Sequence, residues 1–353
     1  MADDLQVSLG QIGQLITIYA LAYAIGSPLL ISFTGNVDRR TLLAVGLGMA
    51  VAGNAITAFA PTYEVIYAAR ILIALGAAVF TPVTSTVAAV ISPPEERGKA
   101  IALVFAGFTA ATALGVPAGT YIGLSVGWRL TFGLVAITAG LGAIAALRSV
   151  PKAIETPKVS LAVFAQTLKN FGLVVVLLIT LLQMTAQLTL FTYVTPYIQS
   201  RTDLAASGLT LFLLVNGIAG FFGNLWGGAL SDRIGTQKTI LLFLVLLAVS
   251  FAMFPLLGSS LLLGAIANAM WGAFGLGFNA PQQTRLVAMA PALASAVLGL
   301  NASFLYLGIS LGSISGGLVL NNFSLDALPW AALSLTILTL IAYAFSLRFD
   351  RQT

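Results

Sequence analysis

The stretch Gly228-Ala229-Leu230-Ser231-Asp232-Arg233-Ile234-Gly235 joins two long apolar segments, and it echoes the loop Gly35-Asn36-Val37-Asp38-Arg39-Arg40 nearly 200 residues earlier. A second motif recurs at about the same distance, because Phe80-Thr81-Pro82 is matched by Phe278-Asn279-Ala280-Pro281. Repetition at one spacing in an apolar chain is typical of two membrane-helix bundles related by an internal parallel repeat. Such a duplication predicts a transporter architecture, with the substrate path between the two halves.

The composition places most of the chain in lipid. Hydrophobic residues make up 59% of it, charged residues only 8%, and the mean hydropathy is +1.00, whereas a soluble domain is about 25% charged. The pI of about 9.6 does not indicate nucleic-acid binding, because the basic residues are scattered over short loops. The sequence contains no Cys and no His, so we expect no disulfide and neither of the commonest metal ligands.

Two other function classes are disfavoured by what the sequence lacks. A membrane-embedded enzyme would carry clustered His, Asp or Glu at membrane depth, and an ATP-driven pump would carry a G-x-x-x-x-G-K-[ST] loop. Neither pattern occurs in this sequence. We therefore predict that the protein is not an enzyme and uses no cofactor and no metal.

Eleven apolar segments are long enough to cross a bilayer. They span roughly 11–34, 41–60, 64–91, 98–124, 128–148, 171–199, 206–230, 237–256, 259–289, 294–321 and 328–347. We therefore expect an all-α polytopic membrane protein with an N-terminal bundle of five helices (1–148) and a C-terminal bundle of six (171–353). The more polar stretch 149–170 reads as a cytoplasmic linker with one short surface helix.

Basic residues predict the orientation of the chain in the membrane. Thirteen of them lie on the side of the linker and the C-terminus, and only Arg129 and Arg201 lie on the other side. This asymmetry puts the linker and the C-terminus in the cytoplasm and Met1 outside. The repeat also predicts a twelfth helix ending where this sequence begins; the alternative is a true eleven-helix protein.

Several short motifs resemble the major facilitator superfamily, in particular its bacterial drug:H+ antiporter-like branch of sugar, nucleoside and chloramphenicol exporters. The motifs are Tyr19-Ala20-Leu21-Ala22 with Gly26-Ser27-Pro28-Leu29-Leu30, Pro93-Pro94-Glu95-Glu96-Arg97-Gly98-Lys99-Ala100, and Gly127-Trp128-Arg129 with Phe132. The resemblance implies two pseudo-symmetric bundles, of which this chain holds eleven of the twelve helices. It also implies a monomer in the bacterial inner membrane that exports small organic solutes or drugs in exchange for protons, by alternating access.

The resemblance extends to a cytoplasmic loop motif, G-x-L-x-D-R-x-G, which gates transport in the family. The matching residues in the second half are Gly228, Leu230, Asp232, Arg233 and Gly235. Asp232 would meet the positive end of a helix near Arg97-Gly98 across the bundle interface and latch that side shut. In the first half the motif is degraded, and Asp38 would substitute there. The alternative is a charged turn that only sets topology.

Arg70 lies about one-third into an apolar segment, where a charge is costly and usually functional. The family places a proton-coupling arginine at this position; the alternative is that Arg70 snorkels outward or pairs with Glu64. A second family motif, on the following segment, implies a hinge. Its residues are Gly115, Pro117 and Gly119, which could equally serve ordinary close packing.

Polar residues within the spans indicate where a solute would bind. Our candidates for the substrate cavity are Gln183, Gln187, Asn216 and Asn279, although hydrogen bonding between helices would explain each of them equally well. All eleven acidic residues lie in loops or at span ends, so this sequence shows no membrane-embedded carboxylate for proton coupling. The alternative to an exporter is a truncated, non-transporting membrane scaffold or an inactive fragment.

Overall fold

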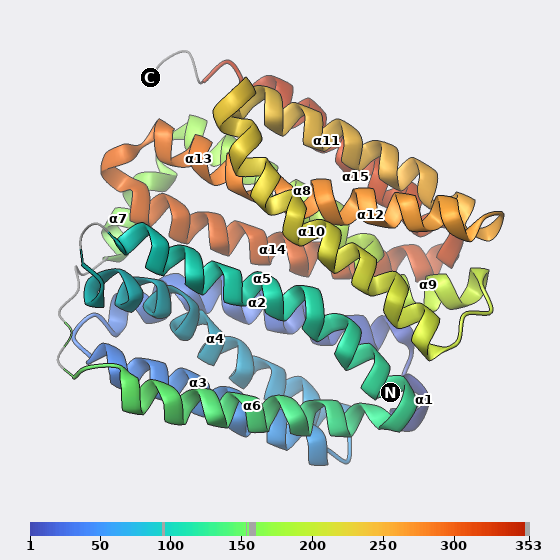
Figure 1. Cartoon of the computed structure of the whole chain (residues 1–353), viewed down its shortest axis with the longest axis horizontal. Coiled ribbons are helices and arrows are strands. Elements are labelled where there is room, and N and C mark those ends of the chain that lie inside the picture. The colour runs from blue at the N-terminus through green and yellow to red at the C-terminus, as the bar shows by residue number, and fades with distance from the viewer. Residues whose placement is uncertain (94–95, 153, 155–159, 350–353) are drawn as a thin grey trace.

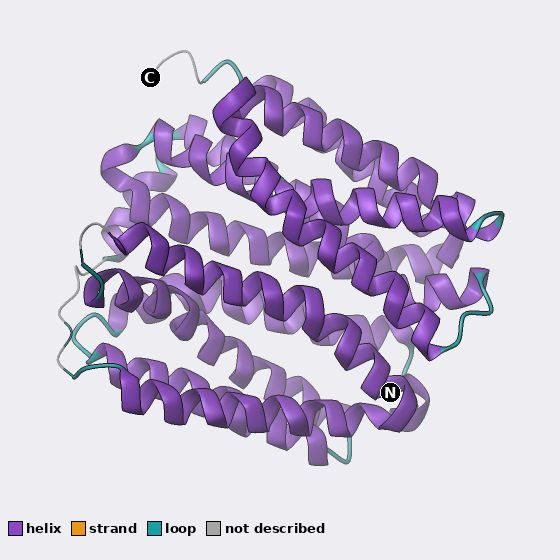
Figure 2. Cartoon of the chain, in the orientation of Figure 1, coloured by secondary structure: helices purple, strands orange, loops and turns teal. Residues whose placement is uncertain are grey.

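The computed structural model describes residues 1–93, 96–152, 154 and 160–349, and every regular element within them is helical (Figure 2). The long helices of the first half are α2 (Leu9–Phe33), α3 (Arg39–Phe59), α4 (Tyr63–Ile91), α5 (Arg97–Ile122) and α6 (Trp128–Ser149). Those of the second half are α8 (Phe171–Phe191), α10 (Ala206–Ile234), α11 (Thr236–Met253), α12 (Leu261–Gly277), α14 (Ala294–Asn322) and α15 (Leu328–Ser346).

Shorter elements complete the chain. They are α1 (Ala2–Leu5), α7 (Leu161–Leu168), α9 (Val194–Arg201), α13 (Asn279–Met289), the π-helix η2 (Gly123–Gly127) and the 3₁₀ helices η3 (Phe254–Gly258), η4 (Pro291–Leu293) and η5 (Leu325–Ala327). The expected linker helix is α7, whose Phe164 is buried against α8 and α14.

Ten helical segments among the described residues are long and apolar enough to cross a membrane. One of them, Ala110–Ser149, is 40 residues long, or about 60 Å at 1.5 Å per residue, twice the thickness of a bilayer core. It contains the end of α5, η2 and α6, with Gly127 at a φ of 124° between them. Counted as two crossings, this segment brings the number to the eleven that the sequence predicts.

Local sequence explains where the helices begin and end. Ser8 and Gln11 form a reciprocal capping box at the start of α2. Asp38 caps α3 and Asn170 caps α8, each through a side-chain oxygen that accepts a backbone N–H. Gly235, at a φ of 91°, separates α10 from α11, and a side chain there would be strained.

The helices form two bundles that lie side by side (Figure 1). In the second bundle α8 packs against α14 and α15, and α12 packs against α10 and α11; in the first, α4 packs against α2 and α3, and α3 against α6. The bundles meet along two seams, one between α2 and α14 and one between α5 and α10. Each seam pairs a helix of the first half with a helix of the second half, which is the arrangement that a parallel repeat predicts.

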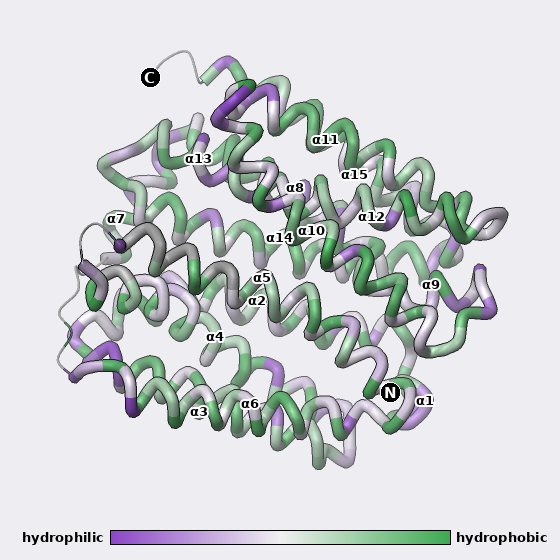
Figure 3. The backbone as a smooth tube through the Cα atoms, in the orientation of Figure 1, coloured by the Kyte–Doolittle hydropathy of each residue, from purple (hydrophilic) through white to green (hydrophobic). Residues whose placement is uncertain are grey.

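Two ends of the molecule can be distinguished. We call the end that carries α7 and the α2–α3 and α10–α11 turns the linker end, and the end that carries α1, α9 and η2 the opposite end (Figure 1). Hydropathy separates the ends from the middle, because hydrophilic residues gather in the turns while the long helices are mostly hydrophobic (Figure 3). The expected bands of charge therefore flank an apolar middle layer.

The two halves differ in how their helices are covered. In α8, 72% of the most apolar window is buried inside the protein, whereas only 6% is buried in the Ala110–Ser149 segment. α8 lies in the middle of the second bundle, and its Ile179 is buried with Phe278 and Tyr343. Among the described residues, no helix of the first bundle is covered to the same extent.

Candidate functional site

The seam between α5 and α10 is built on direct backbone contact. A Cβ added at Gly217 of α10 would lie 2.7 Å from both the Cα and the carbonyl oxygen of Ala113 on α5, so only glycine fits there. Pro117 lies four residues after Ala113 and has no N–H to donate to that carbonyl. The proline therefore leaves an α5 carbonyl free at the point where α10 comes closest.

The contact at Gly217 does not continue toward the linker end. Gly228 lies eleven residues further along α10, about three turns and thus on the same face, yet a Cβ there would meet no atom of the described residues within 4 Å. Gly107, on the α5 side nearer the linker end, is open in the same way. The two helices therefore touch toward the opposite end and diverge toward the linker end, as their ribbons do (Figure 1).

The other two residues of the predicted hinge do not face this seam. A Cβ at Gly115 would meet no atom within 4 Å, and one at Gly119 would meet the Thr131 methyl of α6 at 3.4 Å. Of the three predicted hinge positions, only Pro117 is therefore linked to the contact with α10.

The seam between α2 and α14 is also closed toward the opposite end. The Ser313 hydroxyl of α14 donates to the Gly13 carbonyl of α2 at 2.7 Å, and the Tyr193 hydroxyl donates to the Ser313 carbonyl at 3.2 Å. Nearer the middle of the membrane layer, the rings of Tyr23 (α2) and Tyr306 (α14) stack with their centroids 3.6 Å apart. Nothing in the sequence marks these pairs, because their members are between 120 and 300 residues apart.

Arg70 lies on α4 close to this aromatic stack. Its guanidinium sits over the Phe132 ring of α6, 4.9 Å from the centroid, and Tyr19 of α2 is near enough to interact with it electrostatically. Its Nε is buried without a hydrogen-bond partner. Glu64 forms no ion pair with it, and the two ion pairs found in the described part of the chain involve other residues. The predicted pairing alternative therefore does not occur in this structure.

The loop motif of the second half forms the turn between α10 and α11. Gly235 supplies the left-handed residue, and the Ser231 and Thr236 hydroxyls lie 2.8 Å apart across the turn. Asp232 and Arg233 are both exposed on the last turn of α10. The helix end that we predicted as the partner of Asp232, near Arg97-Gly98, is the N-terminus of α5, which begins at Arg97. The side chain of Arg97 lies outside what the structure describes.

The corresponding loop of the first half is ordered by hydrogen bonds to its own backbone. The Asp38 carboxylate accepts from the Thr41 N–H and hydroxyl, each at 3.1 Å. The buried Arg39 guanidinium donates to the carbonyls of Thr34 and Gly35. These contacts order the α2–α3 turn, and the Asp38 side chain caps α3 in this state.

The predicted cavity residues lie within the second bundle and hydrogen-bond there. Gln183 and Gln187 of α8 both donate to the Gly275 carbonyl of α12, at 2.9 and 3.5 Å, and Gln187 accepts from the Trp271 indole N–H at 3.1 Å. This carbonyl lies just before the break between α12 and α13. The two glutamines therefore brace a discontinuous helix.

The two asparagines lie elsewhere. The Asn216 amide of α10 donates to the backbone carbonyl and side-chain oxygen of Asn268 on α12, at 2.9 and 3.2 Å. The Asn279 amide donates to the nearby Leu276 carbonyl at 3.2 Å. All four side chains are thus engaged in protein contacts in this state.

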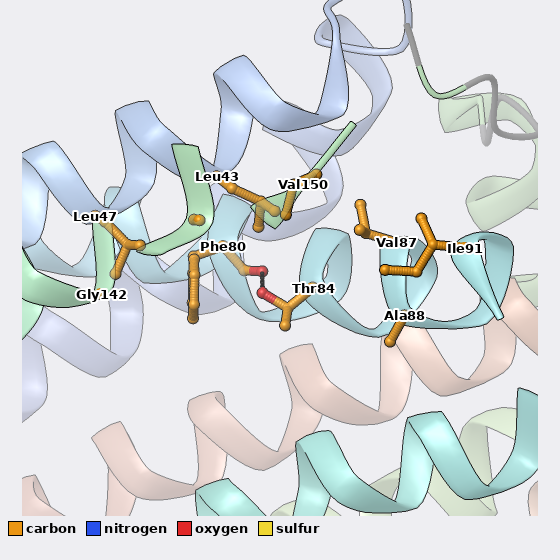
Figure 4. Close-up of a pocket in the computed structure, with 10 residues that line it drawn as sticks. Leu43, Leu47, Phe80, Thr84, Val87, Ala88, Ile91, Gly142 and Val150 are labelled. Atoms are coloured by element: carbon orange, nitrogen blue, oxygen red, sulfur yellow. Dashed lines mark hydrogen bonds between the residues drawn. The ribbon is translucent and has the colours of Figure 1, made fainter. Parts of the chain in front are cut away.

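An apolar pocket of about 280 Å³ lies between α3, α4 and α6 (Figure 4). Its walls include Leu43, Phe80 and Val87, and the Thr84 hydroxyl at its edge is bonded to the Phe80 carbonyl of its own helix. None of the predicted site residues lines it. In the second half, the equivalent position next to Phe278 is filled by Ile179 of α8.

Two ion pairs tie together the opposite end of each bundle. Arg129, at the start of α6, pairs with Asp4 of α1, and Arg201, at the end of α9, pairs with Asp326 of η5. The partners are 125 residues apart in both cases, so the pairs are counterparts under the repeat, with the signs exchanged. The hydrogen bonds from Arg129 and then from Trp128 hold the pKa of the Asp4 carboxyl below its ordinary value.

Comparison with known proteins agrees with this architecture. The sequence profile of the Major Facilitator Superfamily matches residues 1–313. An uncharacterized MFS-type transporter of Bacillus subtilis strain 168, YbcL, is 30% identical over 342 residues, which is 97% of this chain and 88% of the relative. The inner membrane transport protein YdhP of Escherichia coli K12 is 33% identical over 327 residues, covering 91% of this chain and 82% of the relative.

Solved structures share the fold at lower sequence identity. The nucleoside transporter NupG superimposes with a TM-score of 0.77 at 14% identity, over 98% of this chain and 92% of that one. A bacterial homologue of the human lysosomal transporter Spinster, in an inward-facing and occupied conformation, gives 0.75 at 17% identity over 100% and 91%. The chain belongs to the major facilitator superfamily, a family of secondary transporters and not of enzymes.

Proposed function

We propose that the protein is a proton-coupled exporter of small organic solutes or drugs that works by alternating access. The observation that carries the proposal is that contact between α10 and α5 changes along α10: the two helices touch at Gly217, whereas Gly228 is open. Two bundles whose α5–α10 contact lies toward one end are suited to rock about that contact. In the alternate state the linker ends would approach and the opposite ends would part.

The loop motif is proposed to act in that alternate state. Asp232 and Arg233 are exposed here, so they are available to a helix end that moves toward them. Closure would bring the carboxylate of Asp232 to the positive N-terminus of α5, which stabilises a negative charge. Gly228 and Gly235 would keep the approach open and the turn tight, while Asp38 would keep the matching turn of the first half ordered.

Arg70 is proposed to couple transport to the proton gradient. A cation at this depth would lower the proton affinity of groups that come near it in the site, because it disfavours their protonated form. Pro117 is proposed as the point where α5 bends. Gln183, Gln187, Asn216 and Asn279 are proposed to contact solute only after exchanging the hydrogen bonds described above. By the positive-inside rule the linker end faces the cytoplasm of a bacterial inner membrane, and one chain suffices.

Transport by purified protein in liposomes tests the proposal. We expect sugars, nucleosides, amphenicols or lipophilic dyes to move when a pH gradient is imposed, and a protonophore to abolish that movement. Arg70→Ala is expected to lose the gradient dependence, while Arg148→Ala, a change at an exposed arginine of the linker end, is expected to keep it. If the inserted wild-type protein moved none of these compounds, the scaffold alternative would replace the exporter.

A further inference from the structure

Among the residues that the structure describes, the charge of Arg70 has no ion-pair partner. The eleven acidic residues of the sequence lie in loops or at helix ends. Both ion pairs found in the described residues lie at the opposite end. The guanidinium has no hydrogen-bond acceptor among the residues described, and its Nε is buried. A cation in a low-dielectric layer favours an anion as its neighbour, because neither ion is then left unscreened.

The groups that do surround Arg70 are aromatic. Phe132 presents its ring face to the guanidinium, which partly offsets the charge through its quadrupole. Tyr19 is near enough to Arg70 to interact with it electrostatically, and its ring is 6.3 Å from that of Tyr306. Tyr306 is in turn held by stacking on the buried Tyr23. The Arg70 guanidinium and the rings of Phe132, Tyr19 and Tyr306 therefore lie next to one another and form one surface.

This surface belongs to both bundles. Arg70, Phe132 and Tyr19 come from α4, α6 and α2 of the first bundle, and Tyr306 comes from α14 of the second. Arg70, Tyr19 and Tyr306 are each half-buried, so part of every side chain is open to a ligand, whereas Tyr23 is closed off. A ligand placed here would touch both sides of the seam that must rearrange during transport.

We propose that Arg70, Tyr19 and Tyr306 bind a small organic anion with a planar ring, so that the substrates of this transporter include aromatic carboxylates. The carboxylate accepts hydrogen bonds from the guanidinium, a geometry that Arg matches with two parallel N–H groups. The ring packs against Tyr19 and Tyr306 in offset or edge-to-face contact. This assignment names the substrate class of the proposed exporter and therefore rests on that proposal.

Four probes separate the contribution of the ligand's charge to binding from that of its aromatic ring. They are benzoate, the neutral benzamide, the cationic benzylamine and the non-aromatic cyclohexanecarboxylate. Binding to the purified full chain is measured by calorimetry. We expect benzoate to bind at least about tenfold more tightly than benzamide, since a hydrogen bond to a charged group is lost in the amide. Benzylamine is expected to bind most weakly, and cyclohexanecarboxylate more weakly than benzoate.

Variants assign the effect to residues. Arg70→Gln should remove the preference for benzoate over benzamide, and Arg70→Lys should keep part of it. Tyr306→Leu should remove the preference for benzoate over cyclohexanecarboxylate. The matched controls are Arg148→Gln and Tyr121→Leu, both at exposed positions. Each variant is first checked for an unchanged elution volume and melting temperature, and Arg70→Lys serves if Arg70→Gln does not fold.

Three results would overturn the site: equal binding of benzoate and benzamide, tighter binding of benzylamine, or full benzoate preference in Arg70→Gln. Flux of the same probes into liposomes distinguishes this failure from that of the proposed function. If benzoate bound but no gradient drove its flux, the proposed exporter function would be refuted and the proposed anion site would stand. If a gradient drove flux of neutral or cationic compounds and anions were not preferred, the exporter function would stand and the anion site would be refuted.

Discussion

Replacing Gly217 with alanine should shift the balance between the two transport states. The added Cβ would lie 2.7 Å from the Ala113 Cα and carbonyl oxygen, whereas carbon atoms pack best at about 3.5–4.0 Å. Because the obstacle is backbone, α5 and α10 must separate by about 1 Å at that point. Overpacking of this kind costs about 1–3 kcal/mol, which would change the ratio of the states about 5- to 150-fold.

The direction of the shift follows from where the contact lies. Gly217 is eleven residues from the start of α10, about 16 Å along a helix about 43 Å long, and Ala113 is about 14 Å from the end of α5. The contact is therefore in the half of the membrane layer nearer the opposite end. Forcing the helices apart there destabilises the present state and favours the one closed at the linker end. Gly228→Ala is the matched control, because its Cβ would meet nothing within 4 Å.

The chain contains no cysteine, so paired spin labels can be placed without removing any residue. One pair, at Ser149 and Lys238, reports on the linker end, and another, at Tyr121 and Ser207, reports on the opposite end; all four positions are exposed. In Gly217→Ala we expect the first distance distribution to move to shorter values and the second to longer ones. Unchanged distributions, or a shift equal to that of Gly228→Ala, would refute the reasoning.

Three further predictions concern the predicted loop, cavity and ion-pair residues. Gly235→Ala should destabilise the protein by about 1–3 kcal/mol, because its φ of 91° and ψ of 147° suit glycine almost alone; thermal unfolding in detergent measures this, and an unchanged melting temperature would contradict it. Gln183→Leu should cost about 1–3 kcal/mol through the lost bond to Gly275, and an equally large loss in Asn279→Ala, which breaks only a local bond, would argue against the brace. The pKa of Asp4 is lowered in the folded protein, so the wild type should be more stable than Asp4→Asn above the ordinary carboxyl pKa of 3.8. This difference in stability should vanish as the pH falls through the lowered pKa. A difference that persists in acid would exclude the ion pair with Arg129 as its source.

Much of the fold could be predicted from sequence, because lipid imposes simple rules on length and polarity. A run of about 20 apolar residues must cross as a helix, and the eleven expected segments coincide with the helices found. The internal repeat predicted which halves form bundles. The continuous apolar stretch 110–149 turns at Gly127, whose φ is 124°, next to the charged Arg129, in agreement with the break expected between 98–124 and 128–148.

The site was harder to predict because its decisive contacts join residues distant in sequence. Arg70 stood out as a charge among apolar residues, but Tyr306 looks like any aromatic side chain in a membrane helix. Gln183 and Gln187 were singled out as polar residues within a span, yet the sequence could not reveal that both donate to Gly275. The hinge motif singled out three residues of α5, of which only Pro117 is associated with the seam. The sequence does not show which face of α5 meets α10, because that depends on packing.

The exchanged signs of the two ion pairs bear on how a duplicated chain assembles correctly. Asp4 pairs with Arg129 in the first bundle, and Arg201 pairs with Asp326 in the second. If the end of one half docked onto the other half by mistake, Asp4 would face Asp326, or Arg201 would face Arg129. Two like charges repel at such a position. The reversal thus lets each half recognise its own end while the chain inserts, although the two halves share one architecture.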